Sequence, residues 1–305
     1  MLDVLIYLTL FLIGTPLLIK SSDYCVIFAS KYSQLSGISK TAIGAIIIST
    51  LTSLPELFVA IASIPLKESE IIIGNLLGAN ITNVLLLIGI SAAIFGIKIK
   101  NKIRFFEMII FATIPFLYGL FFTFDATLGF FCLIIFFSLS KNLLSPTKKS
   151  RKRIKNRKQE LEILVKLLFS ILILLASAEI IVLSIKNLSE IIGFSKTIFS
   201  ALILSLLTTL PELSVSIASS KRNEYDILLG NIFGSCFVNI NLIFGFSLLF
   251  SKFLLTTKEI LLIFISIISY LSFVIFALDN KLERLEGLIM ILIYILYVFI
   301  GISII

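Results

Sequence analysis

The fold is decided by the stretch Leu51-Thr52-Ser53-Leu54-Pro55-Glu56-Leu57, which recurs 156 residues later as Leu207-Thr208-Thr209-Leu210-Pro211-Glu212-Leu213. Each copy lies inside a long apolar run, over 41–64 and 197–220, and each places a glutamate directly after a proline. A charged carboxylate inside a membrane is costly unless it faces a polar cavity or a cation. We therefore predict that Glu56 and Glu212 are functional.

The repeat continues beyond these heptapeptides at the same offset. Gly37-Ile-Ser-Lys-Thr41 recurs as Gly193-Phe-Ser-Lys-Thr197, Gly74-Asn75 with Gly78 recurs as Gly230-Asn231 with Gly234, and Asn83 recurs as Asn239. Nearly half of the positions from 37 to 89 are identical to their counterparts without a gap. Leucine-rich helices align by chance, but proline, glutamate, asparagine and glycine in register do not.

The composition is that of a membrane protein. Of the 305 residues 58% are hydrophobic and only 14% are charged, whereas about 25% are charged in a soluble domain. These proportions exclude a soluble enzyme, a secreted disulfide scaffold and a disordered chain. Since one helical crossing needs about 20 residues, the apolar runs predict about ten spans, near 4–20, 41–64, 71–97, 105–123, 126–140, 162–185, 197–220, 227–250, 259–278 and 286–304.

The distribution of basic residues predicts the orientation. Residues 141–158 contain nine lysines and arginines, and such loops stay in the cytoplasm. Most other basic residues then fall on the same side, so both termini are expected outside, and no cleavable signal peptide is expected. The net charge of +8 therefore indicates orientation and contact with membrane lipid, rather than a nucleic-acid or obligate protein partner.

Five spans separate equivalent positions of the two repeats, and five is odd, so the second copy enters the membrane inverted. We predict an all-α integral membrane protein with a five-helix repeat over 1–140, a basic cytoplasmic linker over 141–160 and an inverted five-helix repeat over 161–305. Inverted repeats with interrupted helices at the bilayer midplane are typical of secondary transporters.

Polar side chains accompany each glutamate at helical spacing. They form the stripes Ser49, Thr52, Ser53, Glu56 and Ser205, Thr208, Thr209, Glu212. Pro55 and Pro211 remove backbone donors and leave carbonyls one turn earlier without partners. Hydroxyls, carboxylates and carbonyls are the ligands that hard cations such as Na⁺ and Ca²⁺ prefer. The competing interpretation, two protonated structural glutamates, does not explain the duplication of the whole stripe.

The span after each stripe adds further polar residues. Asn83, Ser235 and Asn239 are expected to add oxygens to the site, whereas Asn75 and Asn231 are assigned to helix–helix hydrogen bonding ahead of ion contact. The pairs Gly74 with Gly78 and Gly230 with Gly234 have the spacing that permits close helix packing.

Other residues restrict the chemistry. The chain has no histidine, and Cys25, Cys132 and Cys236 are too far apart in sequence for a CxxC metal site, so a zinc-type site is not expected. Asp23 and Glu179 are also 156 residues apart and lie near the ends of spans. For these two acids a gating or interfacial role and simple solvation are both open. Glu107 is interpreted as an interfacial charge.

The paired motifs resemble the cation/calcium exchanger superfamily, in its sodium/calcium exchanger branch. That branch carries two inverted repeats with a G-T-S-L-P-E-like helix followed by a G-N-x-x-G-S helix. The resemblance covers both halves of the chain. It implies Ca²⁺ between Glu56 and Glu212, with the backbone carbonyls of Thr52 and Thr208. It also implies Na⁺ competing for the same carboxylates with the hydroxyls of Ser49, Ser53, Ser205, Thr209 and Ser235, and Asn83 and Asn239 in the middle of the cluster.

The sequence departs from the family motif at five positions. Leu51 and Leu207 replace glycine, Ala79 and Thr209 replace serine, and Asn239 stands where many members have aspartate. The two carboxylates that remain are enough to neutralise one Ca²⁺, whereas one sodium position is weakened.

Sodium/calcium antiport is the preferred function, and proton-coupled antiport of calcium or another divalent cation is the alternative, because two facing carboxylates favour binding of a proton. The proton-coupled branch usually has an acid where Gly78 and Gly234 stand. A channel or a membrane scaffold is the remaining class. No nucleophile or phosphate-binding loop indicates an enzyme, and no cofactor is expected beyond the transported ions.

Overall fold

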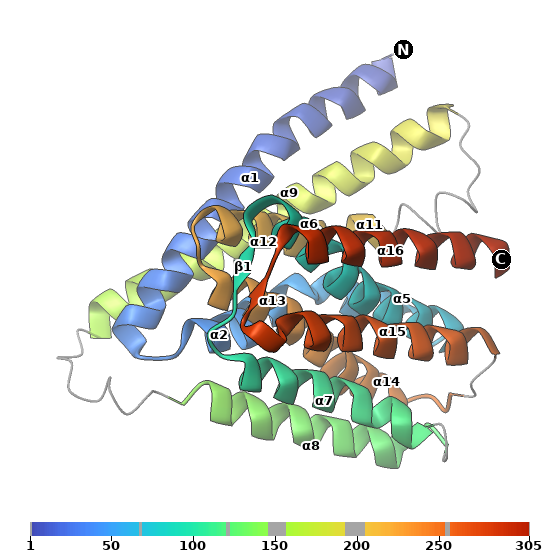
Figure 1. The fold of residues 1–305 in the computed structure, drawn as a ribbon. Coiled ribbons are helices and arrows are strands. Elements are labelled where there is room, and N and C mark those ends of the chain that lie inside the picture. Colours follow the sequence, from blue (N-terminus) through green and yellow to red (C-terminus); the bar gives the residue numbers. More distant parts are fainter. Residues whose placement is uncertain are drawn as a thin grey trace.

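The structure is a computed structural model that describes residues 2–66, 69–119, 123–145, 157–192, 205–253 and 257–304. These residues are helical almost throughout (Figure 1). The helices are α1 (Leu2–Ser36), α2 (Lys40–Ala42), η1 (Ile43–Ile48), α3 (Ser49–Thr52), α4 (Leu54–Ser63), α5 (Ser69–Ile81), η2 (Thr82–Leu87), α6 (Ile88–Phe95), α7 (Lys102–Gly119), α8 (Ala126–Leu143), α9 (Arg157–Ile192), α11 (Ser205–Thr208), α12 (Leu210–Lys221), α13 (Tyr225–Val238), η5 (Asn239–Phe244), α14 (Gly245–Leu248), α15 (Thr257–Phe276), η6 (Ala277–Asp279) and α16 (Arg284–Ile304). The strands are β1 (Ile97–Lys98) and β2 (Lys281–Leu282).

Within the described residues, six helices are long and apolar enough to cross a membrane. They cover Val4–Ser36, Ser69–Phe95, Ala126–Leu143, Arg157–Ile185, Tyr225–Leu248 and Glu259–Asp279. A seventh candidate is the pair Lys40–Thr52 and Leu54–Ser63, which bends by 45° at its break. The chain is therefore a mostly helical, multi-pass membrane protein.

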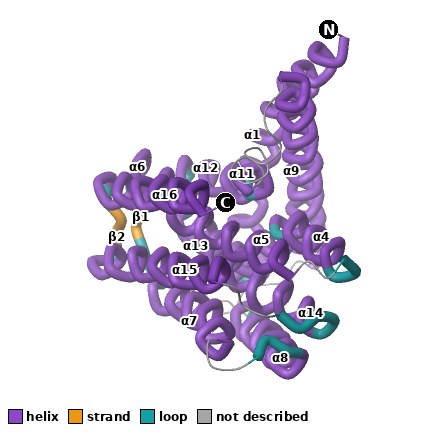
Figure 2. Tube along the Cα trace, turned by 90° about the vertical axis from the view of Figure 1, so that its right-hand side faces the viewer, coloured by secondary structure: helices purple, strands orange, loops and turns teal. Residues whose placement is uncertain are grey.

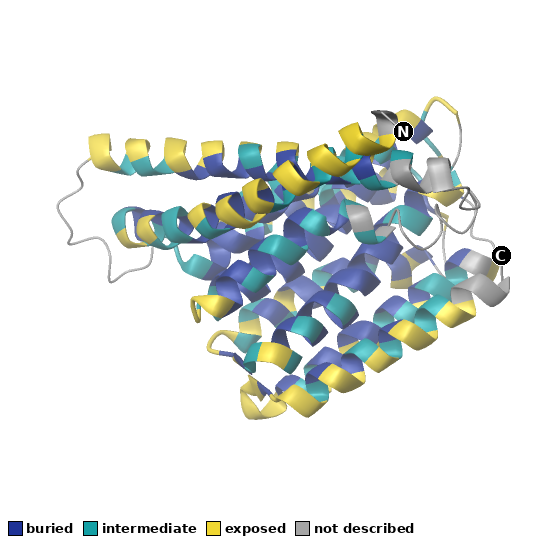
Figure 3. Ribbon diagram, turned by 90° about the horizontal axis from the view of Figure 1, so that it is seen from above, coloured by how far each residue is buried: buried dark blue, intermediate teal, exposed yellow. Residues whose placement is uncertain are grey.

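The centre of the molecule is formed by the continuous helix α13–η5–α14, which is buried along almost its whole length. Its aromatic side chains pack against neighbouring helices: Phe233 contacts Phe273 of α15, with ring centroids 4.5 Å apart, and Phe105 of α7 at 5.8 Å. The helix α5–η2–α6 is also mostly buried, whereas only 17% of the α1 span is. Figure 3 shows this gradient from a buried interior to exposed outer helices.

Helices α1 and α9 lie side by side at the edge of this core (Figures 1 and 2) and run in opposite directions. Both are longer than the predicted spans. Helix α1 continues past residue 20 because its second half buries apolar residues such as Val26 against α9 and α12. Ser21 and Ser22 donate to carbonyls of their own helix, and Asp23 forms an ion pair with Arg222 at 3.3 Å. Helix α9 begins at Arg157, so helices cover both ends of the predicted linker, and residues 146–156 lie outside the described part.

Two short strand pairings fix the relative direction of α7 and α15. At one end β1 pairs antiparallel with β2, with Ile97 opposite Leu282. At the other end Phe124, after α7, forms a bridge with Phe253, before α15. Because β1 precedes α7 and β2 follows α15, the two helices run antiparallel.

The bent segments have matching breaks. Ser53, between α3 and α4, has φ −83° and ψ 11°, and Thr209, between α11 and α12, has φ −89° and ψ 8°. Each break precedes a proline in the first turn of the next helix, Pro55 or Pro211. Proline tolerates this position because the first turn needs no backbone donor there, so the sequence repeat produces the same break twice.

Three π-helical segments, η1, η2 and η5, interrupt the spans of the core. Segment η2 begins one residue before Asn83, and segment η5 begins at Asn239, which is the repeat counterpart of Asn83. Such segments occur often at functional sites. They were not predicted, because hydrophobic periodicity does not separate a π turn from an α turn.

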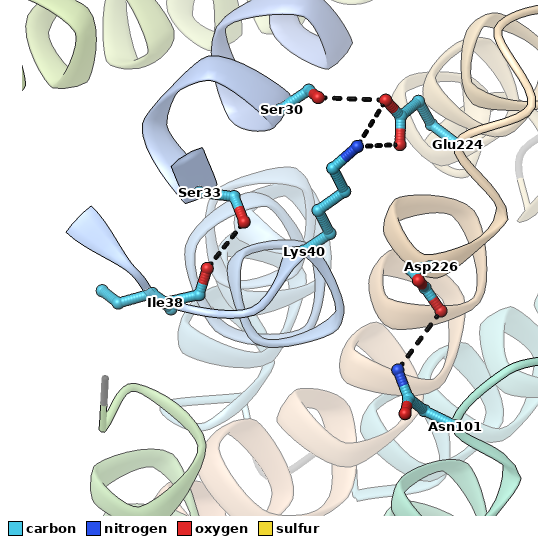
Figure 4. Close-up of polar contacts among 7 residues, drawn as sticks. All are labelled: Ser30, Ser33, Ile38, Lys40, Asn101, Glu224 and Asp226. Atoms are coloured by element: carbon cyan, nitrogen blue, oxygen red, sulfur yellow. Dashed lines mark hydrogen bonds and ion pairs between the residues drawn. The ribbon is translucent and has the colours of Figure 1, made fainter. Parts of the chain in front are cut away.

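An ion pair joins the start of α2 to the turn before α13 (Figure 4). The ammonium of Lys40 lies 2.6 Å from both carboxylate oxygens of Glu224, and the Ser30 hydroxyl of α1 donates to the same carboxylate at 2.9 Å. Nearby, Asn101 donates to Asp226 at 3.5 Å. These contacts connect α1, α2 and the α12–α13 turn at one end of the molecule.

We expect Glu224→Gln to lower the thermal unfolding midpoint in detergent by about 2 °C, because a half-buried, charge-assisted contact is worth about 1 kcal/mol. Glu162→Gln is the matched control, since Glu162 and Lys166 form an ion pair exposed to solvent and exposed pairs contribute little. An equal loss in both variants would contradict the assignment of Glu224 as a stabilising contact.

Candidate functional site

The two repeated glutamates are both inside the protein. Glu56 lies in the first turn of α4 and Glu212 in the first turn of α12, with 1% and 0% of their surfaces exposed. Their negative charges are close enough to repel each other. Because two buried carboxylates of like charge are unfavourable without a counter-ion, the arrangement suits a cation between them.

The hydroxyl of Ser235, on α13, connects both halves of the site. It donates to Glu212 Oε1 at 3.4 Å, lies 2.8 Å from the Ser53 hydroxyl and accepts from Asn83 Nδ2 at 3.3 Å. Glu212 also interacts with the hydroxyl of Thr52. Side chains from α3, the α3–α4 break, η2, α12 and α13 are thus brought together.

Four buried oxygen atoms of predicted ligand residues receive no hydrogen bond within the described part of the chain. They are Glu56 Oε2, Glu212 Oε2, Asn83 Oδ1 and Asn239 Oδ1. A buried acceptor without a donor costs about 1–3 kcal/mol. Two carboxylate and two amide oxygens without donors are what a hard cation would coordinate.

The remaining hydroxyls of the stripes are mostly bonded within their own helices. Ser49 Oγ donates to Ala45 O at 2.5 Å, and Thr209 Oγ1 donates to Leu206 O at 3.0 Å. Both side chains are buried, and Thr208 is half-buried. The backbone of Ser205 belongs to α11, but its side chain lies outside the described part. A serine or threonine hydroxyl that donates to a carbonyl keeps lone pairs for a cation.

The glycines of the second repeat allow close helix contact. A Cβ on Gly230 would lie 2.5 Å from the carbonyl oxygen of Thr41, and a Cβ on Gly234 would lie 2.3 Å from Cα of Ala45. This approach brings Asn231 Oδ1 to 3.5 Å from the Thr52 hydroxyl. The glycines of the second repeat therefore allow α13 to lie directly against the segment that carries the first polar stripe.

The corresponding contacts of the first repeat are only partly described. A Cβ on Gly74 meets nothing within 4 Å among described residues, and one on Gly78 meets only the Tyr297 hydroxyl, at 3.6 Å. Residues 197 and 201, the repeat counterparts of Thr41 and Ala45, lie outside the described residues. Asn75, on the same helix, is half-buried, and no contact of its amide nitrogen is described.

Two buried asparagines were missed in the sequence. Asn80 accepts a hydrogen bond from Asn239 Nδ2 at 2.9 Å, and Asn241 donates to the carbonyls of Phe111 and Phe237 at 3.0 and 3.2 Å. Neither residue has a strongly polar counterpart at the 156-residue offset, so the sequence repeat does not indicate them. Their signal was a strongly polar side chain inside an apolar span.

The other candidate residues lie away from this cluster. Glu179 and Glu107 are exposed, and Asp23 pairs with Arg222. The cysteines are buried and free. Within the described residues, no group of three or more histidine, cysteine, aspartate or glutamate side chains is placed to hold a metal. The Glu56 and Glu212 cluster is thus the candidate site.

Comparison with known proteins agrees with this geometry. The pattern of the sodium/calcium exchanger protein family matches residues 6–151 and 163–302. The chain belongs to this family. The resemblance recognised in the two motifs is confirmed. Family members are transporters rather than enzymes.

Similar proteins cover almost the full chain. An uncharacterized membrane protein of Methanocaldococcus jannaschii is 29% identical, over 94% of this chain and 95% of its own. Sodium/calcium exchanger MaX1 of Methanosarcina acetivorans is 27% identical, over 94% and 95%. A solved structure of the sodium-calcium exchanger NCX_Mj, soaked with 10 mM Na⁺ and zero Ca²⁺, has a TM-score of 0.85 at 26% identity, covering 96% of this chain and 98% of that one. The fold is thus that of an exchanger of this family.

Proposed function

We propose that the protein is a sodium/calcium antiporter in which Ca²⁺ and Na⁺ compete for a site built on Glu56 and Glu212. The observation that carries the proposal is the set of four buried oxygens without donors, two from carboxylates and two from amides. Membership of the exchanger family supports it.

Calcium is favoured by charge and ligand type. Glu56 and Glu212 together neutralise one divalent cation, and Asn83 and Asn239 add neutral oxygens. The chain has no histidine, and Cys236, beside the cluster, is a single thiol that faces the Asn80 carbonyl. A borderline metal such as zinc would therefore lack the set of nitrogen and sulfur ligands that it prefers.

Sodium coupling follows from shared ligands. The buried hydroxyls of Ser49, Ser53, Thr209 and Ser235 lie in the same stripes as the carboxylates, so sodium ions bound there would use Glu56 and Glu212 as well. Binding of one ion then excludes the other, and each ion shifts the equilibrium between states only through its preference for one of them. Downhill entry of sodium would drive calcium out.

We further propose ten crossings in two inverted repeats, over 1–140 and 161–305. The ten crossings would be the six candidate spans, the bent pair, α7, α16 and the segment that ends in α11–α12. Two observations support inversion: the breaks at Ser53 and Thr209 match, and the equivalent helices α7 and α15 run antiparallel.

A third observation is the contact between residues 156 positions apart. Asn80 Nδ2 donates to the carbonyl of Cys236 at 3.5 Å, and Cys236 Sγ lies 4.0 Å from the carbonyl of Asn80. Equivalent positions contact each other reciprocally at a two-fold axis. This contact therefore supports a pseudo-two-fold axis close to the proposed site.

The remaining proposals concern the environment. The basic linker 141–160 is placed in the cytoplasm, with both termini outside, because of the positive-inside rule. Lipid is the expected contact of the exposed apolar faces of α1, α8, α9 and α16. We propose no enzymatic activity, no cofactor other than the transported ions, and no nucleic-acid or obligate protein partner.

The test is calcium uptake into sodium-loaded proteoliposomes, compared with vesicles that carry only a pH gradient. We expect uptake that requires internal sodium and that falls to the level of protein-free vesicles without it. Uptake driven by protons and indifferent to sodium would replace this proposal with proton-coupled antiport. Calcium uptake that depends on neither the sodium gradient nor the pH gradient would indicate a channel.

A further inference from the structure

The two asparagines of the site are equivalent in sequence but are held differently. Asn83 donates its amide N–H to the Ser235 hydroxyl at 3.3 Å. By the repeat, Asn239 would donate to residue 79, which is an alanine and has no acceptor side chain. Asn239 instead donates to Asn80 Oδ1, at 2.9 Å. The site is therefore asymmetric at one pair of contacts.

Asn80 is well placed for this role. It lies on α5, directly after Ala79, and is completely buried. Its own amide N–H donates to the carbonyl of Cys236 at 3.5 Å. Because that donor is engaged, the Asn80 side chain has its oxygen turned toward Asn239, and the direction of the amide is defined.

The consequence concerns the ligand atom of Asn239. An asparagine amide has one oxygen and one nitrogen of nearly equal size, and only the oxygen can bind a cation. With its nitrogen bonded to Asn80, the Asn239 oxygen has no donor within the described residues, as is also true of the Asn83 oxygen. Both amide oxygens are then free to bind an ion.

We propose that Asn80 is a positioning residue that orients the Asn239 carbonyl oxygen toward the transported cation, replacing a hydroxyl that is absent at Ala79. The proposal rests on the proposed function, because it assumes that Asn239 binds the ion. Asn80 acts through Asn239 and does not itself bind the cation.

Removing the acceptor tests this role. In Asn80→Leu, which has a similar volume, the Asn239 amide can turn its N–H toward the ion. We expect the half-saturating calcium concentration to rise about five- to tenfold, since one hydrogen bond of about 1 kcal/mol is lost. The maximal transport rate of the reconstituted protein is expected to stay within about twofold.

A rescue variant separates positioning from packing. In Asn80→Leu combined with Ala79→Ser, the new hydroxyl stands where Ser235 stands in the second repeat, and it offers Asn239 an acceptor. We expect the half-saturating concentration to return to within about twofold of wild type. Ala79→Ser alone is measured beside it, because a serine at this position can also bind the ion directly. A positioning role predicts a larger gain in affinity from Ala79→Ser in the Asn80→Leu protein than in the protein that keeps Asn80.

Asn241→Leu is the matched control. Asn241 is a buried asparagine two residues after Asn239, but its amide donates to Phe111 and Phe237. Its replacement is expected to lower the unfolding midpoint without changing the half-saturating calcium concentration. If Asn80→Leu cannot be purified folded, the smaller Asn80→Ala is measured with the same rescue and the same expected shift.

Calcium binding to purified protein is measured beside transport, so that failures can be told apart. An unchanged half-saturating concentration in a folded Asn80 variant, or no rescue by Ala79→Ser, would overturn the positioning role alone. If the wild-type protein bound no calcium, the proposed function would fail and the positioning role with it.

Discussion

We expect Glu56→Gln and Glu212→Gln each to abolish calcium exchange while leaving a folded protein. Each substitution keeps the shape of the side chain but removes one of the two charges that neutralise Ca²⁺. Removing one partner of a buried charge interaction costs about 3–5 kcal/mol, so calcium affinity should fall at least about a hundredfold. Transport in proteoliposomes should drop to background.

The unfolding midpoint without calcium makes this prediction sharper. In the wild type the Glu56 and Glu212 carboxylates repel each other and each has a buried oxygen without a donor. Glutamine removes one charge and adds an N–H that can donate a hydrogen bond. We therefore expect an unchanged or higher midpoint in the absence of calcium, and loss of the calcium-dependent rise that ligand binding produces.

Glu107→Gln is the control for these variants, because Glu107 is an exposed acid on α7. It should retain both transport and the calcium-dependent rise in the midpoint. Robust exchange by Glu56→Gln and by Glu212→Gln would refute the site. Lower midpoints in calcium-free buffer would mean that the carboxylates stabilise the fold itself.

The sequence predicted the elements that depend on local chemistry. Pro55 and Pro211 predicted interrupted helices at equivalent places, and the structure has breaks two residues before each. The spacing of Ser49, Thr52, Ser53 and Glu56 predicted one polar face, and all four side chains are buried. These features follow from proline geometry and helical periodicity, which act over a few residues.

Features that depend on distant contacts could not be predicted. Helix α1 continues through Asp23 because Val26 and Ala29 beyond it are buried in one cluster with distant residues of α9 and α12, such as Val215. Asn80 joins the site because Asn239 comes within 2.9 Å of it, although its repeat counterpart is Cys236. Repeated polar residues therefore indicate the symmetric part of the site but not the asymmetric part.

The second large effect is expected for Gly234→Ala. Helix α13 and segment η1 cross so closely here that a Cβ on Gly234 would lie 2.3–2.7 Å from three backbone atoms of Ala45. Backbone cannot move aside as a side-chain tip can, so the helices must separate. We expect a loss of about 3 kcal/mol, at the upper end for overpacking, although alanine itself favours a helix by about 1 kcal/mol over glycine.

Transport should be lost together with stability, because the residue after Gly234 is Ser235, which contacts Ser53, Asn83 and Glu212. Gly14→Ala is the control: its Cβ would lie 3.0 Å from Ile181 Cγ1 and 3.3 Å from Ile180 Cγ2, whereas the backbone oxygen of Ser177 is 3.4 Å away. Side chains, and not backbone, then need to move by a few tenths of an ångström. The measurements are the unfolding midpoint and calcium uptake. If Gly234→Ala left both unchanged, the close crossing of α13 and η1 would not be what holds Ser235 in the site.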